Sequence, residues 1–363
     1  MTMKLSALAA VLGALAGLLL FTPCLATAGE VPPTPEYKAL APIRHGNLTV
    51  FPVVAATTHD TRGFLTLDEG LRSGEVVVTE SGSVQPLVRR RHVPITHDGA
   101  QVNQLVLVNN SKRPLILLAG EIVTGGKQDR VIGKDRIIPP ESDPIDLSVF
   151  CVEPGRWTGA SAKFDGNAMN GTPMAQPALR GKAMGAKDQA QVWAEVGKTK
   201  NSLSEMVSGA AGPLQETSSY ARVMENKDVK QQVDSVAEPI QHSYQSLIQQ
   251  LRDQNAVGVV AAVNGQIVWA DIFASTSLLE KYWPKLVGSY AAEAVVTRTK
   301  GYEVDTKSAQ RFLDNLEGRH ETVEREPGLY RHTEITGDGF RAFELTSLLP
   351  KTGFDVHLAK MVE

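Results

Sequence analysis

One stretch indicates the fold most strongly: Val257-Gly-Val-Val-Ala-Ala-Val263, then Asn264-Gly265, then Gln266-Ile-Val-Trp-Ala270. Asn-Gly tolerates the positive φ angles of a type I′ turn, so it joins the two apolar runs as the strands of a β-hairpin. The strands of a hairpin run antiparallel, and the stretch therefore predicts antiparallel pairing in the second half of the chain.

Short strands are also predicted between residues 48 and 152. Four β-branched or aliphatic runs are bounded by Gly, Asn, Ser or Pro: Leu48–Val54, Glu75–Thr79, Gln104–Val108 and Pro114–Ala119. A fifth strand follows from strict alternation, which places Ile145, Leu147, Val149 and Cys151 on one apolar face. Many short strands at this spacing are typical of an antiparallel β-sandwich or barrel.

Helical periodicity appears between these strands and the hairpin. Thr158–Lys187 is rich in Gly, Ala, Met and Asn without an apolar period, which predicts a long, mobile surface loop. Two apolar stripes at helical spacing follow, ending near residue 252: first Val192, Val196, Leu203 and Met206, then Val229, Val233, Val236, Ile240, Tyr244, Leu247 and Leu251. Pro239 lies inside the second stripe and is expected to kink or split the helix.

After the hairpin, Ser277 and Glu280 form a capping-box pattern that predicts another helix, and Asp305–Leu316 predicts a shorter one. Phe354, Val356 and Leu358 indicate a final strand. The expected class is α+β: an antiparallel sandwich or barrel-like core with a helical insertion around 158–252 and C-terminal helices. Residues 42–363 are expected to form a single domain.

Composition limits the classes of function. The chain has 363 residues, with 37 Lys and Arg against 40 Asp and Glu and a formal net charge of −3. A nucleic-acid partner needs concentrated positive charge, so this balance argues against one. The proportions also exclude a disordered or collagen-like chain.

The first 28 residues have the pattern of an export signal. Lys4 precedes an apolar run over 5–21, and Ala26-Thr27-Ala28 is a cleavage pattern. The alternatives are a retained membrane anchor and a lipid anchor on Cys24. Residues 29–41 are rich in proline and predict an extended tether. After cleavage the protein is expected in the periplasm or outside the cell, without membrane contact.

The most unusual motif is the run from Gly120 to Arg130, which contains Glu121, Gly125-Gly126, Lys127-Gln128 and Asp129-Arg130. Paired glycines next to cationic side chains permit backbone N–H groups to approach an anion. The spacing does not fit a P-loop, because Glu121 and Gln128 stand where that motif needs glycine and a hydroxyl residue. The alternative is a Gly-Gly hairpin with solvated charges at its rim.

A second cluster lies at Cys151–Trp157. Cys151 shares the apolar face of its strand, which favours a buried structural role over a nucleophile. Glu153 and Arg156 are consistent with either a ligand site or a local ion pair. Trp157 is expected to be a lid on the core, with a stacking platform as the alternative. The sequence has no clustered metal-ligand spacing, serine-hydrolase elbow or dinucleotide motif, so no metal or cofactor is implied and catalytic residues remain unassigned.

These motifs resemble the first type of ARG and rhodanese-phosphatase-superfamily-associated domain. The resemblance rests on Asn109-Asn110-Ser111, Ala119–Glu121, Gly125–Arg130, Pro139-Pro140, Cys151–Glu153 and Gly155–Trp157, with weaker agreement at Gln191–Trp193 and 273–294. It covers roughly residues 42–358. It implies no reaction and no catalytic residue, but it implies that the Gly120–Arg130 and Cys151–Trp157 segments belong together.

Three functions are compared. In the first, an exported module binds an anionic or carbohydrate-like ligand through nine residues: Glu121, Gly125, Gly126, Lys127, Gln128, Arg130, Glu153, Arg156 and Trp157. In the second, a hydrolase uses Glu121 or Glu153 as general base, with Lys and Arg side chains stabilising charge. In the third, the 229–251 stripe docks on a partner protein, although burial in the domain core is favoured. The sequence does not fix the oligomeric state.

Overall fold

The computed structural model describes residues 37–81, 102–159, 161, 163–165, 172–250, 254–297, 303–349 and 353–363. The predicted export signal and the tether before residue 37 lie outside this part of the chain. None of the helices in the described ranges is long and apolar enough to cross a membrane.

The predicted hairpin is confirmed and lies inside a large antiparallel sheet. β13 (Ala256–Val263) pairs with β14 (Gln266–Phe273), and the turn residues Asn264 and Gly265 have φ angles of 52° and 77°. The strands run in the order β1-β3-β13-β14-β18-β17-β16-β15, with β2 also paired to β3. The remaining bounds are β1 Tyr37–Ala39, β2 Ile43–His45, β3 Leu48–Ala55, β15 Arg319–Glu326, β16 Tyr330–Gly337, β17 Phe340–Ser347 and β18 Asp355–Val362.

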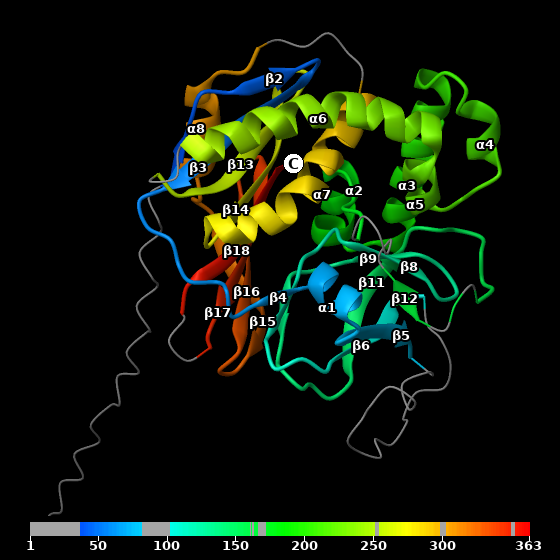
Figure 1. Ribbon diagram of the computed structural model, residues 1–363, viewed down its shortest axis with the longest axis horizontal. Helices are drawn as coiled ribbons and strands as arrows, with labels where there is room; N and C mark the ends of the chain where they lie inside the picture. Colours follow the sequence, from blue (N-terminus) through cyan, green and yellow to red (C-terminus); the bar gives the residue numbers. More distant parts are fainter. Residues whose placement is uncertain are drawn as a thin grey trace, which may run out of the picture. The chain divides into compact units, whose positions relative to one another are not determined.

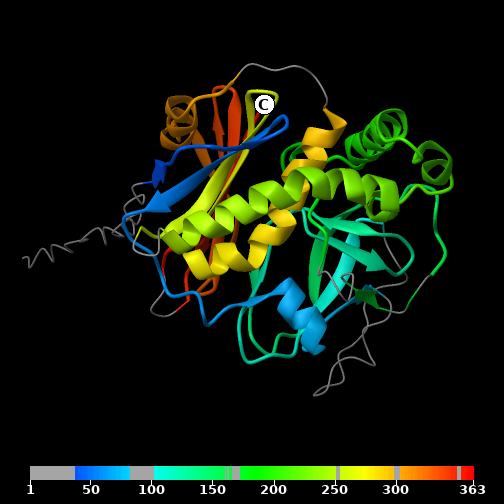
Figure 2. The ribbon, with the colours of Figure 1, turned by 45° about the horizontal axis from the view of Figure 1, so that its top comes forward.

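Helices cover both faces of this sheet (Figures 1 and 2). α6 (Lys227–Gln250) and α7 (Thr276–Val296) pack on one face, where Leu48 and Val259 share a core with Ile240 and Leu286. α8 (Thr306–Asp314) packs on the other face through Ala309 and Leu313. Because both faces are covered, β3 and β13 are buried along their whole length.

A second body of the fold is a closed barrel beside the sheet. It contains β5 (Val76–Glu80), β6 (Gln104–Asn109), β8 (Ile122–Gly125), β9 (Arg130–Ile132), β11 (Ile145–Cys151) and β12 (Phe164–Asp165). Leu107, Leu147 and Val149 are among the apolar side chains that fill its interior. A small sheet of β4 (Leu65–Thr66), β7 (Leu115–Leu117) and β10 (Arg136–Ile138) adjoins it, next to α1 (Leu67–Ser73).

The helical insertion lies between the barrel strands and the hairpin in sequence. It comprises α2 (Pro177–Gly181), a π-helical turn η2 (Lys182–Ala186), α3 (Gln189–Met206), α4 (Ala211–Gln215), α5 (Tyr220–Glu225) and α6. Ile122 and Val131 of the barrel share a core with Leu179, Val192 and Tyr220. These helices therefore close one side of the barrel.

A series of paired, buried charges connects the large sheet to the barrel. Nδ1 of His357 on β18 lies 2.6 Å from Asp135, which precedes β10, and its Nε2 lies 3.1 Å from Asp271 on β14. Arg180 on α2 donates two bonds to Asp271, at 2.8 and 2.9 Å. All four side chains are fully buried. The charges are paired with one another, as burial requires.

The α+β class with antiparallel sheets, a barrel and C-terminal helices is confirmed, and four local expectations need correction. The loop predicted over 158–187 is helical from Pro177 to Ala186, because its small residues pack against the barrel. Strand pairing starts at Tyr37, inside the predicted tether. α6 continues through Pro239, so the split is wrong and the kink stays a prediction, and α7 is capped by Ser275 rather than Ser277. Strands β15, β16 and β17 were not predicted.

Candidate functional site

The Gly-Gly motif is the loop of a hairpin between β8 and β9, with Val123 opposite Arg130. Gly125 and Gly126 have φ angles of +119° and +48°. A Cβ on Gly125 would lie 2.6 Å from Ser161 Oγ, and one on Gly126 would lie 2.1 Å from the Phe164 ring. Only glycine fits at both positions, and this lets the loop pack directly onto β12.

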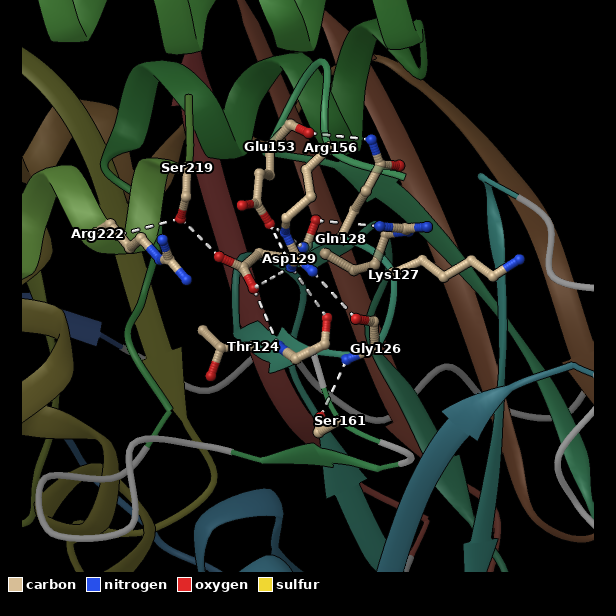
Figure 3. A network of polar contacts seen from close by, with 12 residues as sticks. Thr124, Gly126, Lys127, Gln128, Asp129, Glu153, Arg156, Ser161, Ser219 and Arg222 are labelled. Carbon is tan, nitrogen blue, oxygen red and sulfur yellow. Dashed lines mark hydrogen bonds and ion pairs between the residues drawn. The ribbon is translucent and has the colours of Figure 1, made fainter. Parts of the chain in front are cut away.

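The two sequence segments that were expected to belong together do meet at this loop (Figure 3). Gln128 Nε2 donates to the Glu153 carbonyl at 3.0 Å, and the Asp129 N–H donates to the Glu153 carboxylate at 3.0 Å. Arg156 donates to the carbonyls of Gly126 (3.1 Å) and Gly125 (3.3 Å), and to the Glu153 carboxylate at 2.5 Å. Glu153 and Arg156 thus form an ion pair that fixes the loop.

A polar pocket of about 260 Å³ opens beside this loop. Asp129 lies in its wall, where one carboxylate oxygen accepts from Gly125 N at 3.0 Å and the other from the Ser219 hydroxyl at 2.6 Å. Ser219 caps α5 and thereby brings the insertion against the barrel. The pocket is lined by Thr124, Gly125, Asp129, Arg156, Ser161, Asp165, Ala221, Arg222 and Glu225.

The electrostatics of the pocket are mixed. Burial raises the pKa of the Asp129 carboxyl above its ordinary value, and the neighbouring Glu153 carboxylate adds to this effect. The hydrogen bond to Glu153 raises the pKa of Arg156, so its guanidinium stays charged. Arg222 is exposed at the pocket, and its guanidinium makes no hydrogen bond within the described ranges.

Several buried polar atoms around the loop lack hydrogen-bond partners in the described part of the chain. They are Glu80 Oε2, Ser81 Oγ, Gln128 Oε1, Arg130 Nη2 and Arg156 Nε. Glu80 belongs to the same surroundings, because its other oxygen accepts from Lys127 N at 2.8 Å. Native proteins rarely leave buried polar groups unpaired, so such a group of atoms indicates a place for water or a polar ligand.

Three of the predicted ligand-binding residues occupy different settings from those expected. Lys127 points away from Asp129 in Figure 3, and its ammonium lies 4.9 Å from the centre of the Trp157 ring. Trp157 is 43% exposed, so the prediction that it is a lid on the core is wrong. Arg130 is completely buried and donates to Val102 O at 2.8 Å, so it is not a solvated rim charge.

Glu121 is buried in a separate cluster. Its Oε1 lies 2.8 Å from the Lys285 ammonium and 3.3 Å from the Thr172 hydroxyl, and its Oε2 accepts from Leu118 N at 2.9 Å. Lys285 also pairs with Asp68 at 2.6 Å. Glu121 does not line the pocket beside Gly125, and the expectation that all the charged candidates share one hollow is wrong for this residue.

Cys151 is fully buried at the end of β11, as its place on the apolar face predicts. Burial raises the pKa of its thiol, which keeps it protonated and unreactive. Within the described residues, no group of three His, Cys, Asp or Glu side chains is placed to hold a metal ion.

Other pocket residues were not among the predicted site residues: Thr124, Asp129, Ser161, Asp165, Arg222 and Glu225. Asp129 belongs to the Gly120–Arg130 motif, but the cations beside it fit an anionic ligand and an aspartate does not. Arg222 and Glu225 come from a helix about a hundred residues further along, and no local pattern connects them to the loop.

The chain was compared with known proteins. A family model for the ARG and Rhodanese-Phosphatase-superfamily-associated Protein domain matches residues 36–361. No curated protein and no solved structure gave a significant match.

Proposed function

The chain belongs to the family of the ARG and Rhodanese-Phosphatase-superfamily-associated Protein domain, and we propose that this member binds a small polyhydroxy ligand in the pocket beside Gly125. The resemblance drawn from the sequence reached the same family. We also propose where the protein is located: removal of residues 1–28 would leave an exported binding module in the periplasm or outside the cell.

The observation that carries the proposal is the concentration of unpaired polar atoms at one loop. Donors and acceptors are both present among them: Arg130 Nη2 and Arg156 Nε donate, whereas Glu80 Oε2 and Gln128 Oε1 accept. Such atoms cost free energy when buried alone, on the order of 1–3 kcal/mol each. A ligand hydroxyl in the pocket would offset that cost for Arg156, the one of these residues that lines the pocket, and water would do so for the others.

The charges in the pocket favour a polyhydroxy compound over an anion. Asp129, Asp165 and Glu225 bring three carboxyl groups to the lining, against the two guanidinium groups of Arg156 and Arg222. Carboxylates accept hydrogen bonds from sugar hydroxyls and repel anions, and guanidinium groups donate to hydroxyl oxygens. A volume of about 260 Å³ is at the small end for ligand sites, which limits the ligand to roughly one sugar ring.

The test is a thermal-shift screen followed by calorimetric titration, with monosaccharides and polyols in one arm and phosphate, sulfate and citrate in the other. Asp165→Asn and Arg222→Gln change exposed pocket residues, and each should weaken binding of a hit about tenfold. Asp143→Asn and Arg72→Gln are matched exposed controls outside the pocket and should bind normally.

The outcomes separate the ligand classes. A sugar that binds the wild type and both controls alike, and both pocket variants about tenfold more weakly, supports the proposal. If only the anions bind, and Arg222→Gln abolishes that binding, the ligand class is wrong. If neither arm binds, or if all four variants bind alike, the pocket is not the binding site.

A hydrolase remains the second candidate, because Asp129 lines this pocket and the Glu153 carboxylate lies next to it. Asp129 has a raised pKa, which suits a proton donor, and Glu153 lies beside it. Phosphoester, glycoside and ester substrates should be compared across the wild type, Glu153→Gln and Glu121→Gln. Loss of turnover in Glu153→Gln alone would favour hydrolysis at this pocket, and equal turnover in all three would exclude both glutamates.

A further inference from the structure

We propose that Thr172 is the nucleophile of a second site, which transfers acyl groups from esters or amides that carry an apolar acyl chain. Its cavity shares Ala221 and Glu225 with the pocket beside Gly125, but its reacting groups are different residues. It is built by three segments far apart in the sequence: α1 with Asp68, Thr172 in the segment before α2, and α7 with Lys285.

The geometry places a hydroxyl between a carboxylate and an ammonium. Thr172 Oγ1 lies 2.7 Å from Asp68 Oδ1 and 2.7 Å from Lys285 Nζ. The Thr172 N–H also donates to Asp68 Oδ1, at 2.6 Å, which fixes the backbone of the residue. A nucleophile, a proton acceptor and an orienting third group within hydrogen-bond distance are the arrangement that activates serine and threonine hydroxyls.

The protonation states of Lys285 and Asp68 determine what each can do in the reaction. Burial alone would lower the pKa of Lys285, but Glu121 and Asp68 outweigh it and raise that pKa, so Lys285 stays an ammonium and only donates. Burial would raise the pKa of Asp68, but Lys285 and Thr172 keep it below the ordinary value, so Asp68 is ionised. Its role as proton acceptor rests on its 2.7 Å contact with the Thr172 hydroxyl. Glu121 holds the Lys285 ammonium from its other side.

Thr172, which is 1% exposed, and Lys285 are both among the residues that line a cavity of about 660 Å³, and we assign this cavity as the substrate space. The remaining wall is mixed: the apolar residues include Met174, Met224, Val233, Pro284 and Ala292, and the polar residues are Glu225, Lys230, Asp234, Gln241 and Ser289. The apolar part of this wall accommodates an apolar acyl chain, with the reacting carbonyl at the Thr172 end.

The reaction balances without a cofactor. Thr172 Oγ1 attacks the carbonyl carbon, its proton passes to Asp68, and the Lys285 ammonium stabilises the negative charge that develops. The Lys285 N–H that Thr172 Oγ1 accepts at rest moves to the carbonyl oxygen in this step, because the other two N–H groups are held by Asp68 and Glu121. The bond from the carbonyl carbon to the leaving oxygen or nitrogen then breaks, and the leaving group takes the proton from Asp68. Water then attacks the Thr172 ester, gives a proton to Asp68 and releases the carboxylic acid, and Thr172 recovers its proton.

The same contacts also have a structural effect, since they hold the segment after Thr172 against α1. A test must therefore read chemistry at the oxygen atom rather than stability. Thr172→Val keeps the shape of the side chain and removes only the hydroxyl, whereas Thr172→Ser keeps the hydroxyl. Circular dichroism and the melting midpoint establish that each variant is folded.

The experiment uses p-nitrophenyl butyrate, p-nitrophenyl hexanoate and a β-lactone as acyl donors. Intact-mass spectrometry with peptide mapping locates any adduct, and nitrophenolate release gives the rate. We expect one acyl group at position 172 in both the wild type and Thr172→Ser, and none in Thr172→Val. Asp68→Asn should acylate at least about 100-fold more slowly. Thr297→Val, which changes an exposed hydroxyl just after the last turn of α7, is the control and should behave as the wild type.

Two outcomes overturn the proposal. One is a folded wild type that acquires no acyl group on Thr172 with any of the three donors and releases nitrophenolate no faster than Thr172→Val. The other is an adduct that persists in folded Thr172→Val, because the nucleophile would then be another residue.

Discussion

At the scale of single residues, the loop beside the pocket depends on a glycine with no room for a side chain. Gly126 combines a φ of +48° with a Cβ position 2.1 Å from the Phe164 ring. Gly155 has a φ of +89°, but a Cβ there would meet open space. The two positions therefore separate backbone strain from steric overlap.

We expect Gly155→Ala to cost about 1–2 kcal/mol of unfolding free energy, which is the cost of a positive φ in a residue with a side chain. Gly126→Ala adds overpacking to that strain and should cost about 2–5 kcal/mol. Urea unfolding of both variants measures the difference. Equal losses would mean that Phe164 moves aside freely and that the loop does not need its tight contact with β12.

At the scale of elements, α6 carries much of the packing on one face of the sheet. Ile240 and Tyr244 are fully buried, and the Tyr244 hydroxyl donates to Gly258 O of β13 at 3.0 Å. The regular apolar stripe that predicted this helix is thus a core-facing surface, and docking of this face on a partner protein is not needed to explain it.

Removal of one core side chain from α6 should destabilise the protein strongly. Ile240→Ala is expected to cost about 2–5 kcal/mol, because it leaves a cavity between α6, α7 and the sheet. Gln245→Ala, one turn further along on the exposed side of the same helix, should change the unfolding free energy by less than about 0.5 kcal/mol. Similar effects for both variants would show that the α6 stripe does not form part of the core.

At the scale of the whole molecule, the barrel and the sheet are joined through the His357 imidazole. Burial alone would lower the pKa of His357, but the carboxylates of Asp135 and Asp271 raise it to about 9. The folded state therefore holds a proton that the unfolded state releases near the ordinary histidine pKa. This contribution to stability is complete below about pH 6.5 and is lost as the pH rises through about 9.

The prediction concerns the difference between two proteins, so that other titrating groups cancel. From pH 6.5 to 9, the wild type should lose on the order of 1–3 kcal/mol more unfolding free energy than His357→Gln. Chemical denaturation at each pH, with both proteins in the same buffers, gives the two curves. Parallel curves over that range would mean that His357 is neutral when folded.

Sequence reasoning found the elements whose patterns are local. The Asn264-Gly265 turn, the alternation in β11 and the stripe of α6 each follow from chemistry within a few residues. β15 was not predicted because its sequence, Arg-His-Glu-Thr-Val-Glu-Arg-Glu, is exposed and has no apolar alternation. The helical structure of residues 177–186 was not predicted because their small side chains become buried only when the barrel is present.

The candidate site divides in the same way. The glycines and the Glu153–Arg156 pair belong to short motifs whose unusual composition can be recognised in the sequence. Ser219 and Arg222 reach the pocket only because α5 folds back onto the β8–β9 loop, and Thr172, Asp68 and Lys285 meet only through tertiary packing. Spacing along the chain carries no information about such encounters.

The large sheet ends, among the strands that the structure describes, at β15, whose residues are exposed from Arg319 to Glu326 except for one partly covered position. A neighbouring molecule that tried to continue the sheet there would have to strip water from several ionised side chains. Growth into filaments by edge-to-edge addition is consequently disfavoured at this border, even in concentrated solution. The charged side chains of β15 thus have two effects: they remove the apolar pattern by which a strand is predicted, and they disfavour polymerisation of the folded protein.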